Sequence, residues 1–88
     1  GDKVISDGLP QVEIYQDEAK ELSMIAALKI VGFAKSKGDA RRLIRGGGAR
    51  LNDYTINDEQ AGLSQSDFVD GKAKISAGKK RHALIVLR

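Results

Sequence analysis

The stretch SKGDARRLIRGGGARLND, residues 36–53, contains the signals for a helix, a helix end and a hairpin in immediate succession. Ser36 followed by Asp39 has the form of a capping box, with Asp in place of the usual Glu or Gln, and predicts the start of a helix. An apolar stripe at helical spacing follows, formed by Ala40, Leu43 and Ile44. Glycines 46–48 end this helix. The segments ARLND and YTIN then predict two short strands joined by a tight turn at Asn52–Asp53.

Three arginines of the same helix, Arg41, Arg42 and Arg45, lie opposite its apolar stripe on a helical wheel. Exposed arginines alone are most often a solvated surface, but further cations lie near them or in the last turn: Lys35, Lys37, Arg50, Lys79, Lys80 and Arg81. Carboxylates look sparse around these positions. Residues 33–88 contain twelve basic and six acidic residues, a net charge of +6, whereas residues 1–32 have a net charge of −3. Clustered, long cations favour a partner with repeated phosphates, and the free N–H groups at a helix start can receive a phosphate.

The segment before this stretch predicts one further helix over residues 17–31, because Met24, Ile25, Leu28 and Val31 recur at helical spacing and Gly32 is a natural stop. Residues 1–16 have no helical period and are interpreted as a linker. Within it, QVEIY alternates and can dock as a short strand or an extended arm.

The segment after the hairpin is irregular over residues 58–70, with Leu63, Phe68 and Val69 as its expected anchors and a turn at Asp70–Gly71. Strands are predicted at 72–76 and 81–87. Ile75 should meet the core, together with Leu84 and Val86 or their alternates. We therefore expect an α+β domain with two helices followed by a small, mostly antiparallel sheet of short strands.

The composition excludes several kinds of site. With no cysteine, this 88-residue chain has no disulfide, cysteine zinc site or thiolate nucleophile. The single histidine, His82, has no carboxylate pair nearby, so we expect it on a strand surface, with no metal and no catalytic residue in this domain. Four aromatic residues are too few for binding dominated by base stacking, and no apolar run is long enough to cross a membrane. The triple glycine is either a loose helix end or a place where an RNA backbone approaches closely.

The residues of the opening stretch resemble the RNA-binding module named after small-subunit ribosomal protein four (the S4-like module), whose pattern is S-[KR]-x-x-A-R-x-x-I-x-x-G-x-[VA]-x-[VL]-N-G. The positions in register are Ser36, Lys37, Ala40, Arg41, Ile44, Gly47, Leu51 and Asn52. The likeness covers about residues 22–88, and Asp53 replaces the usual turn glycine. It implies a fold that binds structured RNA with its second helix and the adjoining hairpin. The candidate RNA-binding residues are then Lys35, Ser36, Lys37, Arg41, Arg42, Arg45, Arg50, Asn52, Lys79, Lys80 and Arg81.

The flanks resemble the C-terminal RNA-binding domain of bacterial-type tyrosyl-tRNA synthetases. DGLPQVEIY is similar to the segment that leads into that domain, and SAGKKRHALIVLR is similar to its closing hairpin. The resemblance implies residues 1–16 as a linker from an absent catalytic region and residues 17–88 as the S4-like domain. It implies a cytoplasmic parent that joins tyrosine to its tRNA with ATP and magnesium, and it leaves open whether that parent is a homodimer. The domain can also pack against that catalytic part.

The nucleotide-binding signatures of such an enzyme, a His-x-Gly-His type motif and a Lys-Met-Ser-Lys-Ser type loop, are absent from this chain. The domain is therefore expected to bind tRNA for tyrosine without catalysing its aminoacylation, and to need no cofactor itself. Two alternatives stay open. One is a ribosomal-RNA binder of the same fold, as in a ribosome-associated heat-shock protein or a pseudouridine synthase. The other is a structural or protein-interaction domain.

Overall fold

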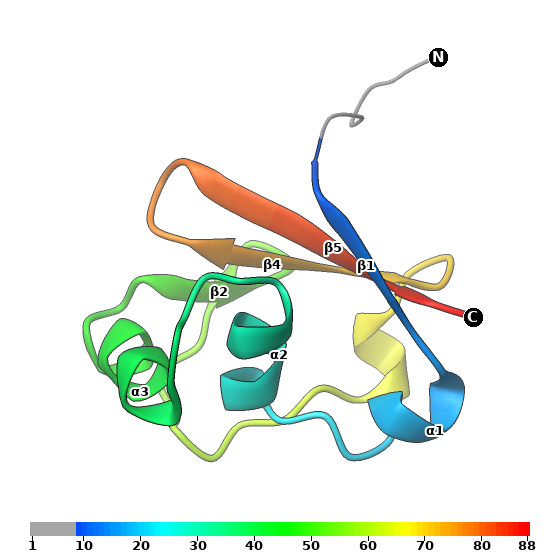
Figure 1. The fold of residues 1–88 in the computed structure, drawn as a ribbon, viewed down its shortest axis with the longest axis horizontal. Helices are drawn as coiled ribbons and strands as arrows, with labels where there is room; N and C mark the ends of the chain where they lie inside the picture. The colour runs from blue at the N-terminus through cyan, green and yellow to red at the C-terminus, as the bar shows by residue number, and fades with distance from the viewer. Residues whose placement is uncertain (1–8) are drawn as a thin grey trace.

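The computed structural model describes residues 9–88 and contains a five-stranded sheet with helices against one face (Figure 1). The strands are β1 (Gln11–Ile14), β2 (Ala49–Leu51), β3 (Tyr54–Thr55), β4 (Lys72–Ala77) and β5 (Arg81–Leu87). The helices are α1 (Gln16–Ala19), α2 (Met24–Ile30), α3 (Lys37–Arg45) and the short 3-10 helix η1 (Gln65–Asp67). The strand order is β1-β5-β4-β2-β3, with β1 parallel to β5 and the other neighbours antiparallel. The predicted α+β class is confirmed.

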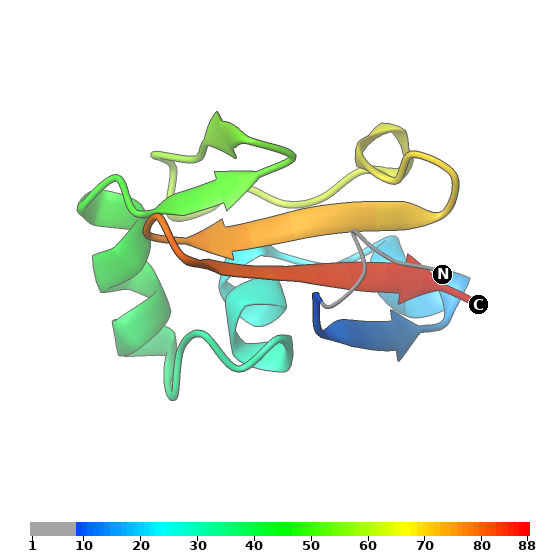
Figure 2. The ribbon, with the colours of Figure 1, turned by 90° about the horizontal axis from the view of Figure 1, so that it is seen from above.

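The hydrophobic core lies between the sheet and the helices, which Figure 2 shows behind the strands. Residues of α2, α3, β4 and β5 meet there without exposed surface or nearly so, among them Met24, Leu28, Ile44, Ile75 and Ile85. Removing these side chains from water is the main force that holds the layers together. On β5 the buried positions are Ala83 and Ile85. The residues that face the core are therefore the ones that alternate with Leu84 and Val86. No helix within residues 9–88 combines the length and apolarity that crossing a membrane requires.

The single helix predicted over residues 17–31 is wrong, because the chain breaks between α1 and α2. The Ser23 side chain caps α2 by accepting a hydrogen bond from the Ala26 N–H at 3.0 Å. At the break, the Met24 N–H donates to the Ala61 carbonyl at 2.9 Å, and the Leu63 N–H donates to the Leu22 carbonyl at 2.8 Å. Pairing with the distant segment 61–63 thus overrides helix propensity. The predicted stop at Gly32 (φ 86°) is confirmed at the end of α2.

The extended arm predicted at QVEIY docks as the edge strand β1. Gln11 lies opposite Leu84 and Ile14 opposite Leu87, and Ile14 is only 5% exposed. Residues 11–14 therefore belong to the sheet. The part of the predicted linker that falls on residues 1–8 lies outside the described residues.

The predicted turns form as expected. Asn52 and Asp53 have φ angles of 52° and 72°, the left-handed backbone that a two-residue hairpin turn of type I′ requires, so Asp53 preserves the turn in place of glycine. The turn at Asp70–Gly71 is also confirmed by positive φ angles. Leu63 anchors its segment at 6% exposure, but Val69 is 65% exposed and is not the anchor that was predicted.

Candidate nucleic-acid interface

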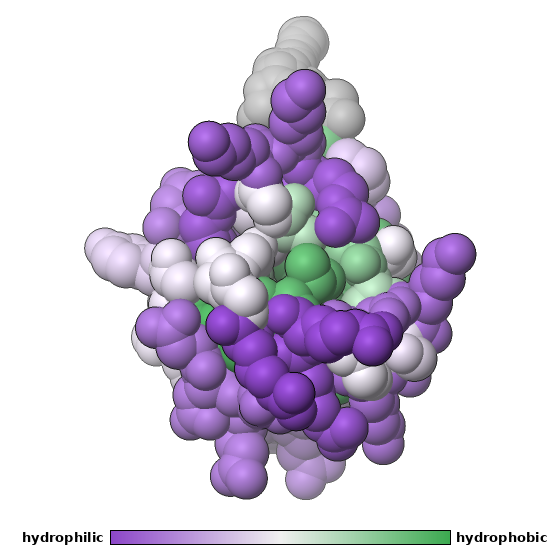
Figure 3. Space-filling model, turned by 90° about the vertical axis from the view of Figure 1, so that its left-hand side faces the viewer, coloured by the Kyte–Doolittle hydropathy of each residue, from purple (hydrophilic) through white to green (hydrophobic). Residues whose placement is uncertain are grey.

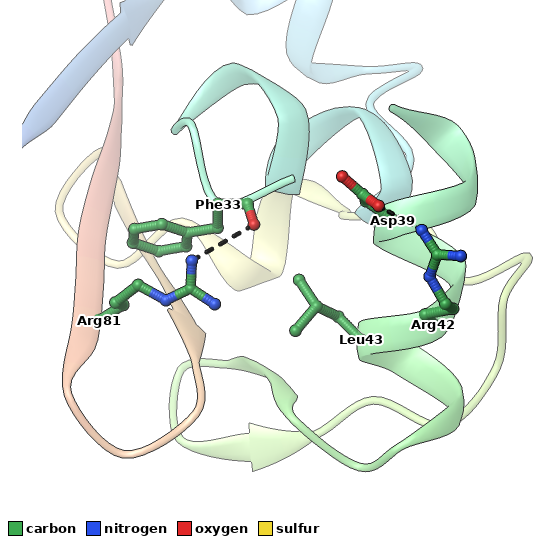
Figure 4. A pocket seen from close by; sticks show the side chains of 5 residues that line it. All are labelled: Phe33, Asp39, Arg42, Leu43 and Arg81. Atoms are coloured by element: carbon green, nitrogen blue, oxygen red, sulfur yellow. Dashed lines mark hydrogen bonds and ion pairs between the residues drawn. The ribbon is translucent and has the colours of Figure 1, made fainter. Parts of the chain in front are cut away.

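Helix α3 is oriented by its cap and by its apolar stripe, as the sequence predicts. The Ser36 side chain accepts a hydrogen bond from the Asp39 N–H at 3.1 Å, and Ala40 and Ile44 are fully buried. The three arginines of α3 are exposed, which confirms their predicted outward placement. They separate into two groups, however, because Arg41 and Arg45 turn towards the loop after β3, whereas Arg42 faces the side on which Phe33 and Arg81 lie (Figure 4).

Glu59 contacts the first group and corrects the expectation that carboxylates are sparse here. Its Oε2 accepts from Arg45 Nε at 2.6 Å and its Oε1 accepts from Arg45 Nη2 at 3.3 Å. Arg41 Nε lies 3.8 Å from Glu59 Oε1. The hydrogen bonds with Arg45 lower the pKa of Glu59 and raise the pKa of Arg45. This carboxylate fixes two arginine side chains and offsets part of their charge.

Asp39 plays the corresponding part beside Arg42. Its Oδ1 accepts from Arg42 Nη2, and its Oδ2 accepts from the Lys35 backbone N–H at 3.1 Å. The side-chain bond from Arg42, with the backbone bond second, holds the pKa of Asp39 below its usual range. The carboxylate is therefore ionised at neutral pH and occupies the N–H group of Lys35 that a phosphate could otherwise have bound.

The cations of the β4–β5 turn are brought beside α3 by contacts between two glycine loops. The Gly78 N–H donates to the Gly48 carbonyl at 2.8 Å, and Arg50 Nη2 donates to the Gly78 carbonyl. Arg50 therefore anchors the turn, and its buried Nε has no hydrogen-bond partner among residues 9–88. Lys79 and Lys80 are exposed at the tip, with no ion pair to a carboxylate within residues 9–88.

His82 holds the same turn from the sheet side, on a strand surface as predicted. Its Nδ1 lies 2.7 Å from the hydroxyl of the buried Ser76, and its Nε2 lies 3.1 Å from the Lys79 carbonyl. Because a carbonyl can only accept, Nε2 donates the hydrogen bond to Lys79. The histidine thus fixes the backbone that presents Lys79.

Between α3 and the β4–β5 turn lies an open hollow of about 310 Å³, lined by Phe33, Asp39, Arg42, Leu43 and Arg81 and called here the Phe33 hollow. Figure 3 shows apolar surface in a depression on this side of the molecule, with hydrophilic side chains around it. The Arg81 guanidinium carbon lies 5.4 Å from the centre of the Phe33 ring, and its Nη1 lies 3.5 Å from the Phe33 carbonyl (Figure 4). Arg42 lies across the hollow from this pair.

The structure brings Arg42 and Arg81 to one hollow with Lys79 and Lys80 on the adjoining turn, but it turns Arg41 and Arg45 towards Glu59 and gives three other predicted residues different contacts. The Ser36 hydroxyl is occupied as the helix cap. The Asn52 side chain is occupied at both ends, donating to the Asp67 carbonyl at 2.7 Å and accepting from the Lys74 N–H at 2.9 Å. Lys37 lines a different groove, beside Lys29 and Ile30 of α2. The hydrogen bonds that Ser36 and Asn52 make within the protein give both side chains a structural role.

Sequence reasoning missed the apolar and acidic members of the site. Phe33 was only one of four aromatic residues judged too few for stacking, and Leu43 was assigned to the buried stripe, but both are half-buried and line the hollow. For Phe33 a signal was available, since it follows Gly32, the predicted helix stop, and precedes the cationic loop. Glu59 gives no local signal, because it reaches the arginines from another loop.

Comparison with known proteins gives a consistent result. A model of the family described as the tyrosine–tRNA ligase SYY-like C-terminal domain matches residues 3–85. The tyrosine–tRNA ligase of Methylocella silvestris is 40% identical over 84 residues, which cover 94% of this chain and 20% of that protein. The enzymes of the same name from Gluconobacter oxydans and Bartonella quintana are 40% and 41% identical over 93% and 96% of the chain. The chain spans about a fifth of the length of these curated relatives.

Proposed function

This chain belongs to the family of tyrosine–tRNA ligase SYY-like C-terminal domains, and from this premise we propose that it binds tRNA through α3 and the β4–β5 turn. The observation that supports the proposal is the arrangement of cations on both sides of one surface. Arg42 of α3 and Arg81 of β5 line the same hollow, and Lys79 and Lys80 extend the positive charge along the turn.

The arrangement suits a row of phosphates better than a single anion. Each guanidinium can donate two parallel hydrogen bonds to one phosphate, while each lysine supplies a compact charge on a long side chain. The β4–β5 turn is joined to the loop after α3 by the hydrogen bond between Gly78 and Gly48. This bond holds the cations of the turn close to those of α3. Such contacts give affinity and orientation without reading the base sequence.

For the longer protein of which this domain would be part, we propose the activity that its relatives' name states, joining tyrosine to tRNA. ATP and magnesium would act in a catalytic region outside this chain, and the domain would bind without catalysing. We further propose a cytoplasmic location and, for the whole protein, a homodimer in which this domain packs against the catalytic region.

Salt dependence tests the binding mode. If phosphates dominate, log affinity for tRNA should fall linearly with log salt, with a slope of roughly 0.7 to 0.9 per phosphate contact. Lys79→Ala with Lys80→Ala should reduce the slope by about 1.4 to 1.8 on the same basis and leave the melting temperature nearly unchanged, because both side chains are exposed. The charge-matched control, Lys20→Ala with Lys29→Ala on the α1–α2 side, should keep the wild-type slope.

The outcomes separate the alternatives. A flat salt response of the wild-type chain would contradict electrostatic binding, and equal losses in the two double variants would show that net charge matters and the location does not. Specificity is tested with tRNA for tyrosine, a second tRNA and a ribosomal RNA fragment at one salt concentration. Equal affinity for all three would contradict the assignment to tRNA.

A further inference from the structure

The Phe33 hollow differs from the rest of the cationic surface because its floor is apolar. Phosphate binding needs only positive charge and N–H donors, and these are met by the exposed side chains around the hollow. Half-buried Phe33 and Leu43 contribute nothing to a phosphate, yet they leave apolar surface open between two arginines. A ligand that complements the hollow therefore combines a flat apolar group with negative charge.

We propose that the Phe33 hollow holds one unpaired nucleotide of the bound RNA, with its base on Leu43 and against the Arg81–Phe33 pair. The proposal rests on the proposed RNA-binding function and adds to it a base subsite in a surface otherwise suited to phosphates. A nucleotide is the part of RNA that matches both properties, since its base has an apolar face and its phosphates are anionic.

The aromatic ring and the guanidinium act together as the stacking surface. With the Arg81 guanidinium carbon 5.4 Å from the centre of the Phe33 ring, the pair forms a cation–π contact that holds the side chain of Arg81 at the edge of the hollow. A guanidinium plane stacks on bases as an aromatic ring does, and unpaired bases are the ones available for such stacking. The bond from Arg81 to the Phe33 carbonyl fixes the arginine further.

The charges around the hollow select the same ligand. Arg42 lies on the opposite wall, held by Asp39, and Lys79 and Lys80 continue from Arg81 along the turn. The phosphates on either side of an inserted base would thus meet cations in both directions. An uncharged aromatic ligand would leave these cations unused, and a paired base would not present its face.

The matched comparison uses the second aromatic–arginine pair of the molecule. Tyr15 and Arg88 form a pair with nearly the same separation, the guanidinium carbon lying 5.6 Å from the ring centre, but at the opposite end near the C-terminus. Phe33→Leu keeps an apolar side chain and removes the ring. It should weaken binding of tRNA for tyrosine roughly tenfold at every salt concentration without changing the salt slope, because no phosphate contact is lost. Tyr15→Leu should bind as the wild type does.

Arg81→Lys provides a second variant that retains the charge. It should also weaken binding with the slope preserved, since an ammonium group cannot replace a stacked guanidinium plane. Wild-type affinity in both Phe33→Leu and Arg81→Lys would overturn the base subsite while leaving the proposed tRNA binding intact. Failure of tRNA binding itself is a different result, since the unmodified chain would then show no salt-dependent affinity.

A measurement on the unmodified chain does not depend on how a variant folds. Single-stranded tetra-adenylate and an abasic ribose-phosphate oligomer of equal length carry the same phosphates and differ only in their bases. Tetra-adenylate should shift the NMR signals of the Phe33 ring and the Leu43 methyl groups, and the abasic oligomer should not. Equal shifts with both probes, or no shift with either, would overturn the proposal.

Discussion

Two carboxylates determine how the arginines of α3 are presented. Asp39 orients Arg42, and Glu59 orients Arg45 and attracts Arg41. Each pair is exposed enough to be screened by water and salt, so its contribution to stability is small. Its larger effect is on binding, because a phosphate that approaches these arginines competes with the carboxylate already present.

Replacing Glu59 tests that competition. Glu59→Gln should strengthen binding to tRNA several-fold, on the order of the attraction between charges near a protein surface, and lower the free energy of unfolding only slightly, because the ion pair is open to solvent. Equilibrium binding and urea denaturation measure the two effects. Glu13→Gln, which removes the same charge from a pair with Arg88 far from α3, is the control. Equal strengthening in the control would show a general charge effect.

The same carboxylates give an expected acid dependence. Their pKa values are lowered in the folded protein, from ordinary values of 3.8 for Asp39 and 4.5 for Glu59, so the unfolded chain binds more protons in this range. Their stabilisation is complete above pH of about 5 and is lost as the pH falls through the lowered pKa values. Urea denaturation from pH 6 to pH 2.5 measures the free energy of unfolding, which should decline less in the Asp39→Asn, Glu59→Gln double variant than in the wild type. An identical decline would exclude these groups as its cause.

At the scale of elements, the link between α3 and β2 is a defined helix end and not a loose one. The Gly47 N–H donates to the Ile44 carbonyl at 3.1 Å, and the Gly48 N–H donates to the Leu43 carbonyl at 2.9 Å. With Gly47 at φ 76°, these bonds form a Schellman motif. Of the three glycines, only the middle one requires the left-handed backbone. The motif directs the chain into β2 and places Gly48 beside the β4–β5 turn.

Two alanine substitutions separate the structural from the binding role of this loop. Gly47→Ala should lower the free energy of unfolding by about 1 to 2 kcal/mol, the cost of a left-handed alanine. Gly48→Ala should be nearly neutral, because an added Cβ would lie 3.6 Å from Leu43 and 3.8 Å from the Gly78 nitrogen, ordinary contact distances. Thermal denaturation compares the two. A loss of RNA affinity in stable Gly48→Ala would reveal close approach of the RNA backbone there, and equal destabilisation would contradict the assignment of the motif.

At the scale of the whole molecule, β1 converts an otherwise antiparallel sheet into a mixed one. Backbone hydrogen bonds join this segment to β5 at both of its ends. The Leu84 N–H donates to the Pro10 carbonyl and the Arg88 N–H donates to the Ile14 carbonyl, both at 2.9 Å. The strand also covers the edge of β5 and adds Ile14 to the core. The folded unit therefore includes residues before position 17.

A chain that begins at Asp17 tests the contribution of β1. It should lose at least about 2 kcal/mol of the free energy of unfolding, the lower range for deletion of a buried isoleucine side chain, in addition to the lost strand pairing. Ile14→Ala should reproduce much of this loss, whereas Glu13→Ala on the exposed face should change stability by less than about 0.5 kcal/mol. Urea denaturation of the three variants gives the comparison. Full stability without β1 would make it a dispensable arm.

Sequence reasoning succeeded where the signals were local. The cap at Ser36, the stripe of α3 and the turn at Asn52–Asp53 each depend on residues a few positions apart. It failed where a distant segment decided the outcome. Segment 61–63 interrupts the first predicted helix, and Glu59 reaches back to α3 from the loop after β3. The Phe33 hollow was missed for the same reason, because its walls come from separate parts of the chain.

The hydrogen bond between the Gly78 N–H and the Gly48 carbonyl has a consequence for the speed of recognition. It joins the loop after α3 to the β4–β5 turn in the free protein, so neither segment has to change its position when RNA binds. In the proposed complex, association would then lose little conformational entropy at these loops, and the field of the positive surface would steer the RNA towards them. Such a surface can capture RNA quickly at low ionic strength and release it quickly as ions screen the attraction.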